Sequence, residues 1–175
     1  MPLVLIKEDG SGKADANSYA DVADCNAYHD GHLYAFAWLN ATTANREKAL
    51  VFATRLIDAE YQFHGRQANS TQALQWPRLA CPGPDAARGL SLASDAVPKA
   101  VVQATCEMAR ELLVADRTGT PLGEGIYLQR SADGTEVIYS RRDRRPIISY
   151  LAQSLLAKYG VPVKSRSGTV PLIRA

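Results

Sequence analysis

The chain has 175 residues and is 46% hydrophobic, which is ordinary for one globular domain with a real core. No stretch approaches the roughly 18–20 uninterrupted apolar residues of a membrane span, so we expect no membrane contact. Residues 1–116 carry 10 Lys and Arg against 14 Asp and Glu, a net −4, whereas residues 117–175 carry 10 against 4, a net +6. This asymmetry favours either stacking of copies of the chain or contact with nucleic acid, and charge alone does not choose between them.

The first fifth of the chain predicts an extended segment and then a helix. Leu3–Ile6 is a short apolar run before Gly- and Asp-rich turn residues, so we expect an edge strand or an extended arm. A helix is predicted from Asp21 to about His29, where apolar residues recur at helical spacing. Asp21 is its expected N-cap, Asp24 forms a weak capping box with it, and Gly31 ends the helix.

A second helix and a long irregular loop follow. Thr43 is the expected cap of a helix that runs to about Glu60 and has a broad apolar stripe. The regular pattern stops over residues 62–95. A connection of about thirty residues in a small domain is usually functional or packed by its own side chains. The candidates for that packing are Phe63, Leu74 and Trp76.

The third helix has the longest apolar stripe of the chain. Ser94 or Asp95 is its expected cap, and Pro98 lies in its first turn, where a missing N–H costs nothing. The stripe ends near Ala115, and a Gly- and Pro-containing segment breaks it.

The last third of the chain predicts a β-hairpin and a final helix. The hairpin spans about residues 124–140, with Asp133-Gly134 in its turn. Pro146 opens a helix that runs through Tyr159 and ends at Gly160. Its expected inward face consists of Ile147, Tyr150, Leu151, Ser154 and Leu155.

Together these elements predict a mainly α fold. We expect a small bundle of about four helices with a long packed loop, a β-hairpin and an extended C-terminal tail. Residues 1–160 form the single domain, and residues 161–175 form the tail.

The sequence contains no recognisable catalytic constellation. Gly10–Lys13 reads GSGK but lacks the first glycine of a phosphate-binding loop, and Ala14 stands where Ser or Thr would hold the metal. His29-x-x-His32 straddles the expected helix end and has no third ligand nearby, so surface or partly packed histidines are favoured over a zinc site. We therefore expect no enzymatic activity, no metal and no cofactor.

The three cysteines are odd in number and far apart in the sequence. Cys25, Cys81 and Cys106 fit neither a disulfide framework nor a metal-ligand pair. Cys25 and Cys106 fall on the apolar faces of predicted helices, where a reduced cysteine acts as a small hydrophobe. We therefore expect reduced thiols.

A basic cluster lies between the hairpin and the last helix, and consists of Arg141, Arg142, Arg144 and Arg145. These arginines could neutralise several phosphates, each contact adding salt-sensitive affinity, while nearby tyrosines stack on unpaired bases. Alternatively, they form salt bridges to an acidic neighbour across a subunit interface. Composition leaves both interpretations open.

An ordered series of motifs resembles one group of phage proteins. Asp15–Tyr19 (DANSY) precedes the first helix, Gly65 follows the second, and Gln-x-Leu-x-Trp-Pro-Arg occupies residues 72–78. Ser-Asp-x-Val-Pro then opens the Ala-rich third helix. This succession resembles the head-to-tail connector or adaptor proteins of tailed bacteriophages, a group also labelled DnaT-like single-stranded-DNA-binding proteins.

The motif residues suggest structural roles. Trp76-Pro77 is typical of an anchor beneath the long loop, with Phe63 beside it and proline directing the chain. Gly65 suggests a backbone position that needs unusual dihedrals or close approach.

The resemblance implies a structural virion protein of the neck, at the head-tail junction, assembled in the cytoplasm of the host bacterium. It implies a ring, commonly of twelve copies, which docks on the portal protein and extends the channel for genomic DNA. The ring would also offer a surface to the next neck or tail protein. The C-terminal segment of such adaptors often reaches the portal, so we expect portal contact from Val170, Leu172 and Ile173. The alternative is a single-stranded-DNA-binding replication protein that uses the 141–145 cluster.

Overall fold

The computed structural model describes residues 3–83, 91–119, 128–130, 134, 136–138 and 146–163. These residues form five helices and three two-stranded antiparallel sheets. The expected mainly helical bundle is therefore confirmed only in part, because small sheets beyond the expected hairpin accompany the helices.

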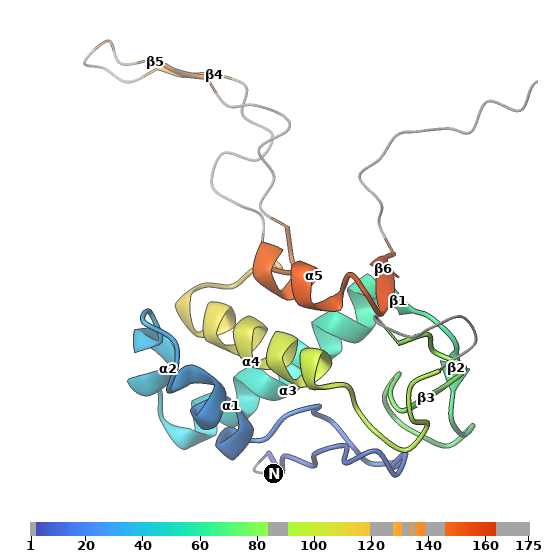
Figure 1. The fold of residues 1–175 in the computed structure, drawn as a ribbon. Coiled ribbons are helices and arrows are strands. Elements are labelled where there is room, and N and C mark those ends of the chain that lie inside the picture. The colour runs from blue at the N-terminus through green and yellow to red at the C-terminus, as the bar shows by residue number, and fades with distance from the viewer. Residues whose placement is uncertain are drawn as a thin grey trace, which may run out of the picture.

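Helix α4 (Lys99–Val114) lies at the centre of the helical body and contacts the other four helices. It packs mainly against α3 (Thr43–Glu60) and α5 (Tyr150–Leu156), and also against α1 (Val22–His29) and the short α2 (Phe36–Leu39). Figure 1 shows α3 and α4 crossing, with α5 on one side of α4 and with α1 and α2 at one end. The core between these helices is continuous with the aromatic residues of the long loop.

The N-cap residues determine where helices α1 and α3 begin. Asp21 accepts the Asp24 N–H, and the Asp24 side chain accepts the Asp21 N–H, which confirms the predicted capping box. For α3 the cap is Thr42, not Thr43, because the Thr42 hydroxyl accepts the Asn45 N–H. The expected cap of α4 at Ser94 or Asp95 is wrong: α4 begins only after Pro98, since the residue before a proline disfavours helical dihedrals.

The start of α5 corrects its predicted inward face. The Ser149 hydroxyl accepts the Ala152 N–H at 3.2 Å, so the helix begins at Tyr150 and not at Pro146. Ile148, Ala152 and Leu156 are buried, whereas Tyr150 and Leu151 are exposed. The buried residues recur every four positions, which is the spacing of one helical face.

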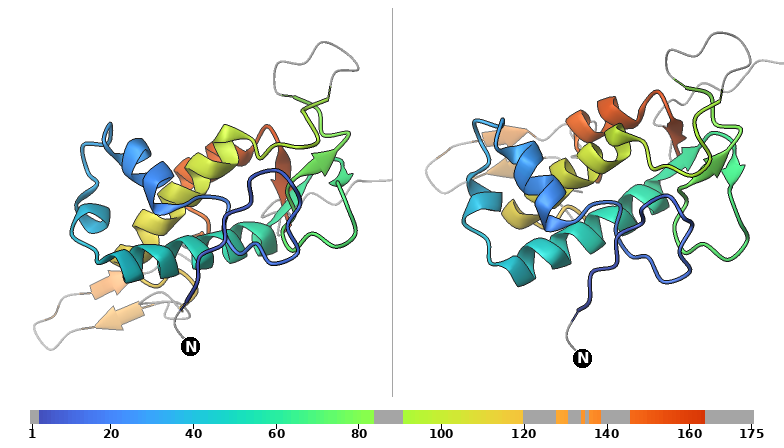
Figure 2. Two further views of the ribbon diagram at one scale, coloured as in Figure 1. Left: turned by 90° about the horizontal axis from the view of Figure 1, so that it is seen from below. Right: turned by 60° about the horizontal axis from the view of Figure 1, so that its bottom comes forward.

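The strands join segments that are distant in the sequence. β1 (Tyr61–Phe63) pairs with β6 (Gly160–Pro162), and β2 (Arg66–Gln67) pairs with β3 (Arg78–Leu79). The first two residues of the expected tail, 161 and 162, therefore lie in a sheet. Figure 2 shows β6 beside the strands that follow α3.

The predicted hairpin is confirmed, with β4 (Leu128–Arg130) paired to β5 (Glu136–Ile138). Gly134, in the turn, has a φ of +86°. Such a φ suits glycine, as expected for a turn containing Asp-Gly.

Cys25 and Cys106 form a disulfide between α1 and α4, so the expectation of reduced thiols is wrong for this pair. Their Cα atoms are 5.2 Å apart, although 81 residues separate them in the sequence. The docking of α1 on α4 brings the two apolar helix faces together, which no spacing rule anticipates. Cys81 is free and buried.

Candidate functional site

Trp76 lies at the centre of the aromatic packing beside the small sheets. Its side chain is fully buried, and its ring meets Phe63 edge-on at 5.6 Å and Tyr159 at 6.3 Å between centroids. The bond between Trp76 and Pro77 is cis. Edge-to-face aromatic pairs stabilise a fold by more than the apolar surface area that they bury. The loop over residues 62–83 is therefore held in place by its own aromatic side chains.

Gly65 allows two loop segments to approach closely. Its φ is +75°, and a Cβ at this position would lie 2.3 Å from the carbonyl oxygen of Leu79. Only glycine fits a position with both properties without strain. Gly65 thereby permits the pairing of β2 with β3.

A buried polar network ties the loop to α3. The Tyr19 hydroxyl donates to Asp58 Oδ1 at 2.5 Å, and the Gln75 N–H donates to Asp58 Oδ2 at 3.1 Å. The Gln75 side-chain amide donates to the carbonyl of Asp58 at 2.6 Å. Burial raises the pKa of the Asp58 carboxyl to about 6. Asp58 therefore connects α3 to the loop through its hydrogen bonds, and its burial disfavours the ionised carboxylate.

The GSGK segment binds a carboxylate of its own chain. The buried Glu8 side chain accepts the N–H groups of Gly10, Gly12 and Lys13 at 2.8–2.9 Å. Successive backbone N–H groups make a concavity that attracts an anion, and here Glu8 occupies it. The backbone donors of this segment are therefore engaged inside the fold.

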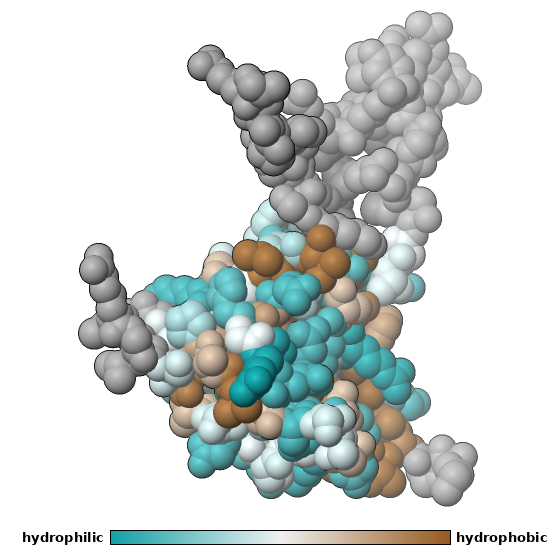
Figure 3. All heavy atoms as spheres, turned by 90° about the vertical axis from the view of Figure 1, so that its right-hand side faces the viewer, coloured by the Kyte–Doolittle hydropathy of each residue, from teal (hydrophilic) through white to brown (hydrophobic). Residues whose placement is uncertain are grey.

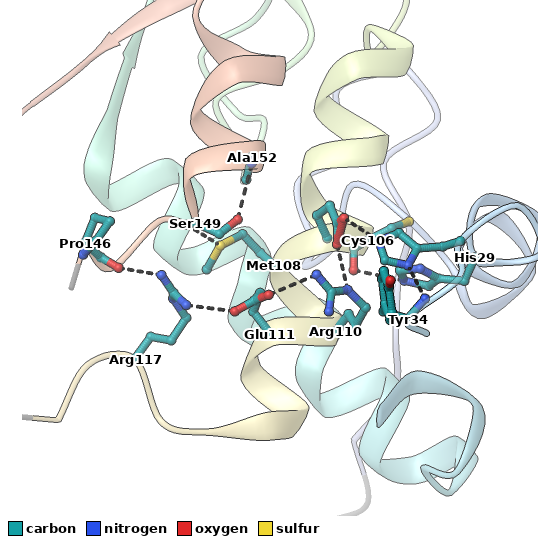
Figure 4. A network of polar contacts seen from close by, with 12 residues as sticks. His29, Tyr34, Cys106, Met108, Arg110, Glu111, Arg117, Pro146, Ser149 and Ala152 are labelled. Carbon is teal, nitrogen blue, oxygen red and sulfur yellow. Dashed lines mark hydrogen bonds and ion pairs between the residues drawn. The ribbon is translucent and has the colours of Figure 1, made fainter. Parts of the chain in front are cut away.

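A charged cluster joins α4 to the segment between α1 and α2 (Figure 4). Glu107 is fully buried and accepts from Arg110 Nε at 2.9 Å. His32 Nε2 lies 3.3 Å from Glu107 Oε1, within ion-pair distance but outside hydrogen-bonding geometry. His29 is buried rather than at the surface. Its ring lies 5.4 Å from that of Trp38 between centroids, in a tilted arrangement, and burial lowers the pKa of its imidazole.

Arg117 links the end of α4 to the start of α5 (Figure 4). Its guanidinium donates to the carbonyls of Pro146 and Ile147 at 2.7 and 2.8 Å, and pairs with Glu111 at 2.8 Å. The guanidinium of Arg117 is buried, whereas Glu111 is partly buried and also pairs with Arg110.

Among the described residues, no group of three or more His, Cys, Asp or Glu could hold a metal ion. No described helix is long and apolar enough to cross a membrane.

An exposed apolar surface surrounds α2. Leu33, Tyr34, Phe36 and Leu39 are 84%, 71%, 67% and 56% exposed, and we call these four residues the α2 surface. In the same segment only Ala35 and Trp38 are buried. The sequence interpretation missed this surface because the helix is too short to show periodicity. Its available signal was the apolar run LYAFAWL at residues 33–39.

Two sets of expected contact residues lie outside the described residues. They are Arg141, Arg142, Arg144 and Arg145, and the tail residues Val170, Leu172 and Ile173. The expected anchors Phe63, Gly65, Trp76 and Pro77 are all described: Phe63 ends β1, Gly65 directly precedes β2, and Trp76-Pro77 directly precede β3.

Residues 3–175 match the family described as "Putative DnaT-like ssDNA binding protein". The chain belongs to this family. No curated protein and no solved structure is significantly similar to it. The match covers the helical body, the small sheets and the C-terminal segment alike, so membership applies to the whole chain and not to one motif.

Proposed function

We propose that the protein is a structural subunit that assembles with copies of itself, as the ring-forming head-to-tail adaptor of a tailed bacteriophage. Its partners would be the portal protein, a neck or tail protein and the genomic DNA in the channel. It would act in the virion neck after assembly in the host cytoplasm. The α2 surface is the observation that carries this proposal.

The α2 surface is typical of a protein interface. Four large apolar side chains within seven residues are at least half exposed. Monomeric proteins rarely expose large contiguous apolar patches, and patches of this kind usually mark interaction sites. Phe and Tyr are also enriched at the buried centres of protein interfaces.

The charge distribution supports contact between copies. The net −4 of residues 1–116 and the net +6 of residues 117–175 place opposite charges on different parts of one chain. Complementary charges across an interface steer association and fix its register. A head-to-tail contact between two different surfaces closes into a ring when its rotation permits.

The oligomeric state of the full chain tests self-assembly. We expect native mass spectrometry to show a closed oligomer, formed alone or on the purified portal. The double substitution Leu33→Asp with Phe36→Asp should release monomers. Val4→Asp is the matched control, since Val4 is similarly exposed but lies on the N-terminal arm. A wild-type chain that stays monomeric both alone and with the portal would refute the proposal.

The C-terminal tail is the proposed portal contact. Val170, Leu172 and Ile173 are apolar residues in an otherwise polar segment, and a segment with alternating apolar residues can dock on a partner by strand addition. Deletion of residues 164–175 should abolish portal binding and leave the helical circular dichroism unchanged. Unchanged portal binding would remove the tail from the proposal.

The position of the protein in the virion is tested with a phage that lacks its gene. Electron microscopy should show DNA-filled or leaking heads separated from finished tails. Normal joined virions in reduced number, after poor genome synthesis, would instead support a replication role.

Single-stranded DNA binding is the second candidate function, because the family description names it. The cluster formed by Arg141, Arg142, Arg144 and Arg145 supplies the positive charge that such binding needs. Salt-sensitive binding of oligonucleotides by the monomer would favour this function over assembly.

A further inference from the structure

A cavity of about 450 Å³ with a mixed polar and apolar lining opens beside the small sheets, at the end of α3. Its lining includes Asp58, Gln62, Arg66, Gln67, Gln75 and Arg78. Figure 3 looks onto the side of the molecule where Figure 1 places these sheets, and shows a mainly hydrophilic surface with hydrophobic residues towards its edges. The cavity volume falls within the range of roughly 300–1,000 Å³ that is usual for small-ligand sites.

Arg78 brings a buried positive charge to the cavity wall. Its guanidinium donates to the carbonyls of His64, Gly65 and Gln75 at 2.7–3.0 Å. It forms no ion pair with a carboxylate of the described residues, and burial lowers its pKa. A guanidinium has five N–H groups, so further donors remain after these three bonds. A buried cation that lacks a counter-charge favours the binding of an anion.

Asp58, the carboxylate that lines the same cavity, is not within ion-pair distance of Arg78. Its two oxygens accept from Tyr19 and Gln75. Burial raises the pKa of Asp58 to about 6, and the more distant charge of Arg78 lowers it only in part. An intimate ion pair with arginine would have the opposite effect.

Arg66 adds a second cation at the rim. Its side chain is exposed on β2 and makes no hydrogen bond or ion pair with the described residues. Gln62 and Gln67 are exposed beside it. The Gln62 amide can donate or accept, whereas the Gln67 amide already donates to the Leu74 carbonyl at 3.1 Å. Arg78 is held in place by the three carbonyls, whereas the exposed Arg66 can adjust its position. The planar guanidinium of arginine can bind two phosphate oxygens at once.

We propose that this cavity binds a phosphate group between Arg66 and Arg78, with the Gln62 amide available to the attached organic group. The cavity exceeds a bare phosphate in size, which favours a nucleotide unit. Its phosphate would come from single-stranded DNA or from a free nucleotide. The inference goes beyond the proposed assembly and depends neither on a ring nor on the arginines at 141–145.

The test uses the full chain with Arg141, Arg142, Arg144 and Arg145 replaced by Gln, so that the cavity is measured alone. The probes are a labelled oligo-dT, dTMP and inorganic phosphate, followed by fluorescence anisotropy and calorimetry. We expect oligo-dT to bind, Arg66→Gln to weaken binding about tenfold, and the salt slope to fall by about 0.7, the value for one phosphate of a single strand. Binding of dTMP alone would assign the cavity to a free nucleotide.

Lys48→Gln is the matched control, since Lys48 is an exposed cation near the other end of α3, about 15 Å of helix away from Asp58. It should leave the affinity unchanged. Arg66→Gln removes no side-chain hydrogen bond or ion pair to the described residues, and unchanged circular dichroism of the variant would show that its loss of binding does not report unfolding. The proposal is overturned if no probe binds at millimolar concentration, or if Arg66→Gln binds as tightly as its parent.

Discussion

Gly65 occupies a position where the backbone leaves no room for a side chain. A side chain there meets both a positive φ and the Leu79 carbonyl oxygen 2.3 Å from the added Cβ. We expect Gly65→Ala to lower the free energy of unfolding by about 1–3 kcal/mol, the usual cost of such strain. Urea denaturation measures it.

Gly31→Ala is the control for this substitution, because no atom lies within 4 Å of a Cβ at Gly31. We expect a change within about 0.5 kcal/mol, as for other surface substitutions. Equal effects at the two glycines would mean that the close approach at Gly65 does not constrain the fold.

The ionisation of Asp58 should make the stability of the fold decrease as the pH rises. Burial raises the pKa of its carboxyl to about 6, above the roughly 3.9 of an unfolded chain. Between these values the folded state keeps a proton that the unfolded state has lost, so this contribution to stability falls as the pH rises from about 4 to 6. It is fully present below pH 4 and absent above pH 6.

Asp58→Asn removes this titration, so the difference in stability between wild type and variant isolates it from other carboxylates. Relative to the variant, we expect the wild-type free energy of unfolding to fall by on the order of 2 kcal/mol between pH 4 and pH 7. Denaturation curves at both pH values measure the difference. A difference that is constant with pH would show that Asp58 is not perturbed.

At the scale of elements, the disulfide fixes α1 on α4. It closes a loop across a sequence separation of 81 residues. By the chain-entropy relation, replacing Cys25 and Cys106 by Ala should lower the stability by about 4 kcal/mol.

Thiol counting checks the pairing itself. Under denaturing, non-reducing conditions, iodoacetamide should modify one thiol, that of Cys81, and after reduction it should modify three. Three modified thiols before reduction would contradict the disulfide.

Arg117 couples α4 to α5 through two carbonyls and Glu111. Arg117→Gln should lower the stability by about 3 kcal/mol, because a buried guanidinium loses its hydrogen bonds to two carbonyls and to Glu111. Lys99→Gln, on the exposed first residue of α4, is the control and should change little. Equal thermal unfolding of the two variants would show that the Arg117 contacts do not support the docking of α5.

At the scale of the whole molecule, substitution of the basic cluster distinguishes contact with DNA from contact with a neighbouring subunit. Replacing Arg141, Arg142, Arg144 and Arg145 by Gln should lower the salt slope of oligonucleotide binding by up to about 3 if each arginine meets a phosphate. If the arginines instead bind an acidic neighbouring subunit, the substitution leaves the salt slope of oligonucleotide binding unchanged. The wild-type oligomer then dissociates at moderate salt concentration. Anisotropy titrations and native mass spectrometry over a salt series distinguish the two.

The sequence by itself determined the elements whose signals are local. The Asp21 capping box, the apolar stripes of α3 and α4 and the Asp-Gly turn of the hairpin each depend on residues a few positions apart. Helical periodicity and caps act within one or two turns, so such elements follow from the chain alone. The motif series likewise anticipated the family.

Only the tertiary structure decided which segments that are distant in the sequence contact one another. The Cys25–Cys106 pair, the β1–β6 sheet and the inward face of α5 all depend on how finished helices dock. The α2 surface and the cavity beside Arg66 arise in the same way, since exposure and enclosure are properties of packed elements. Local spacing carries no information about docking, because side chains far apart in the sequence meet only after the core has formed.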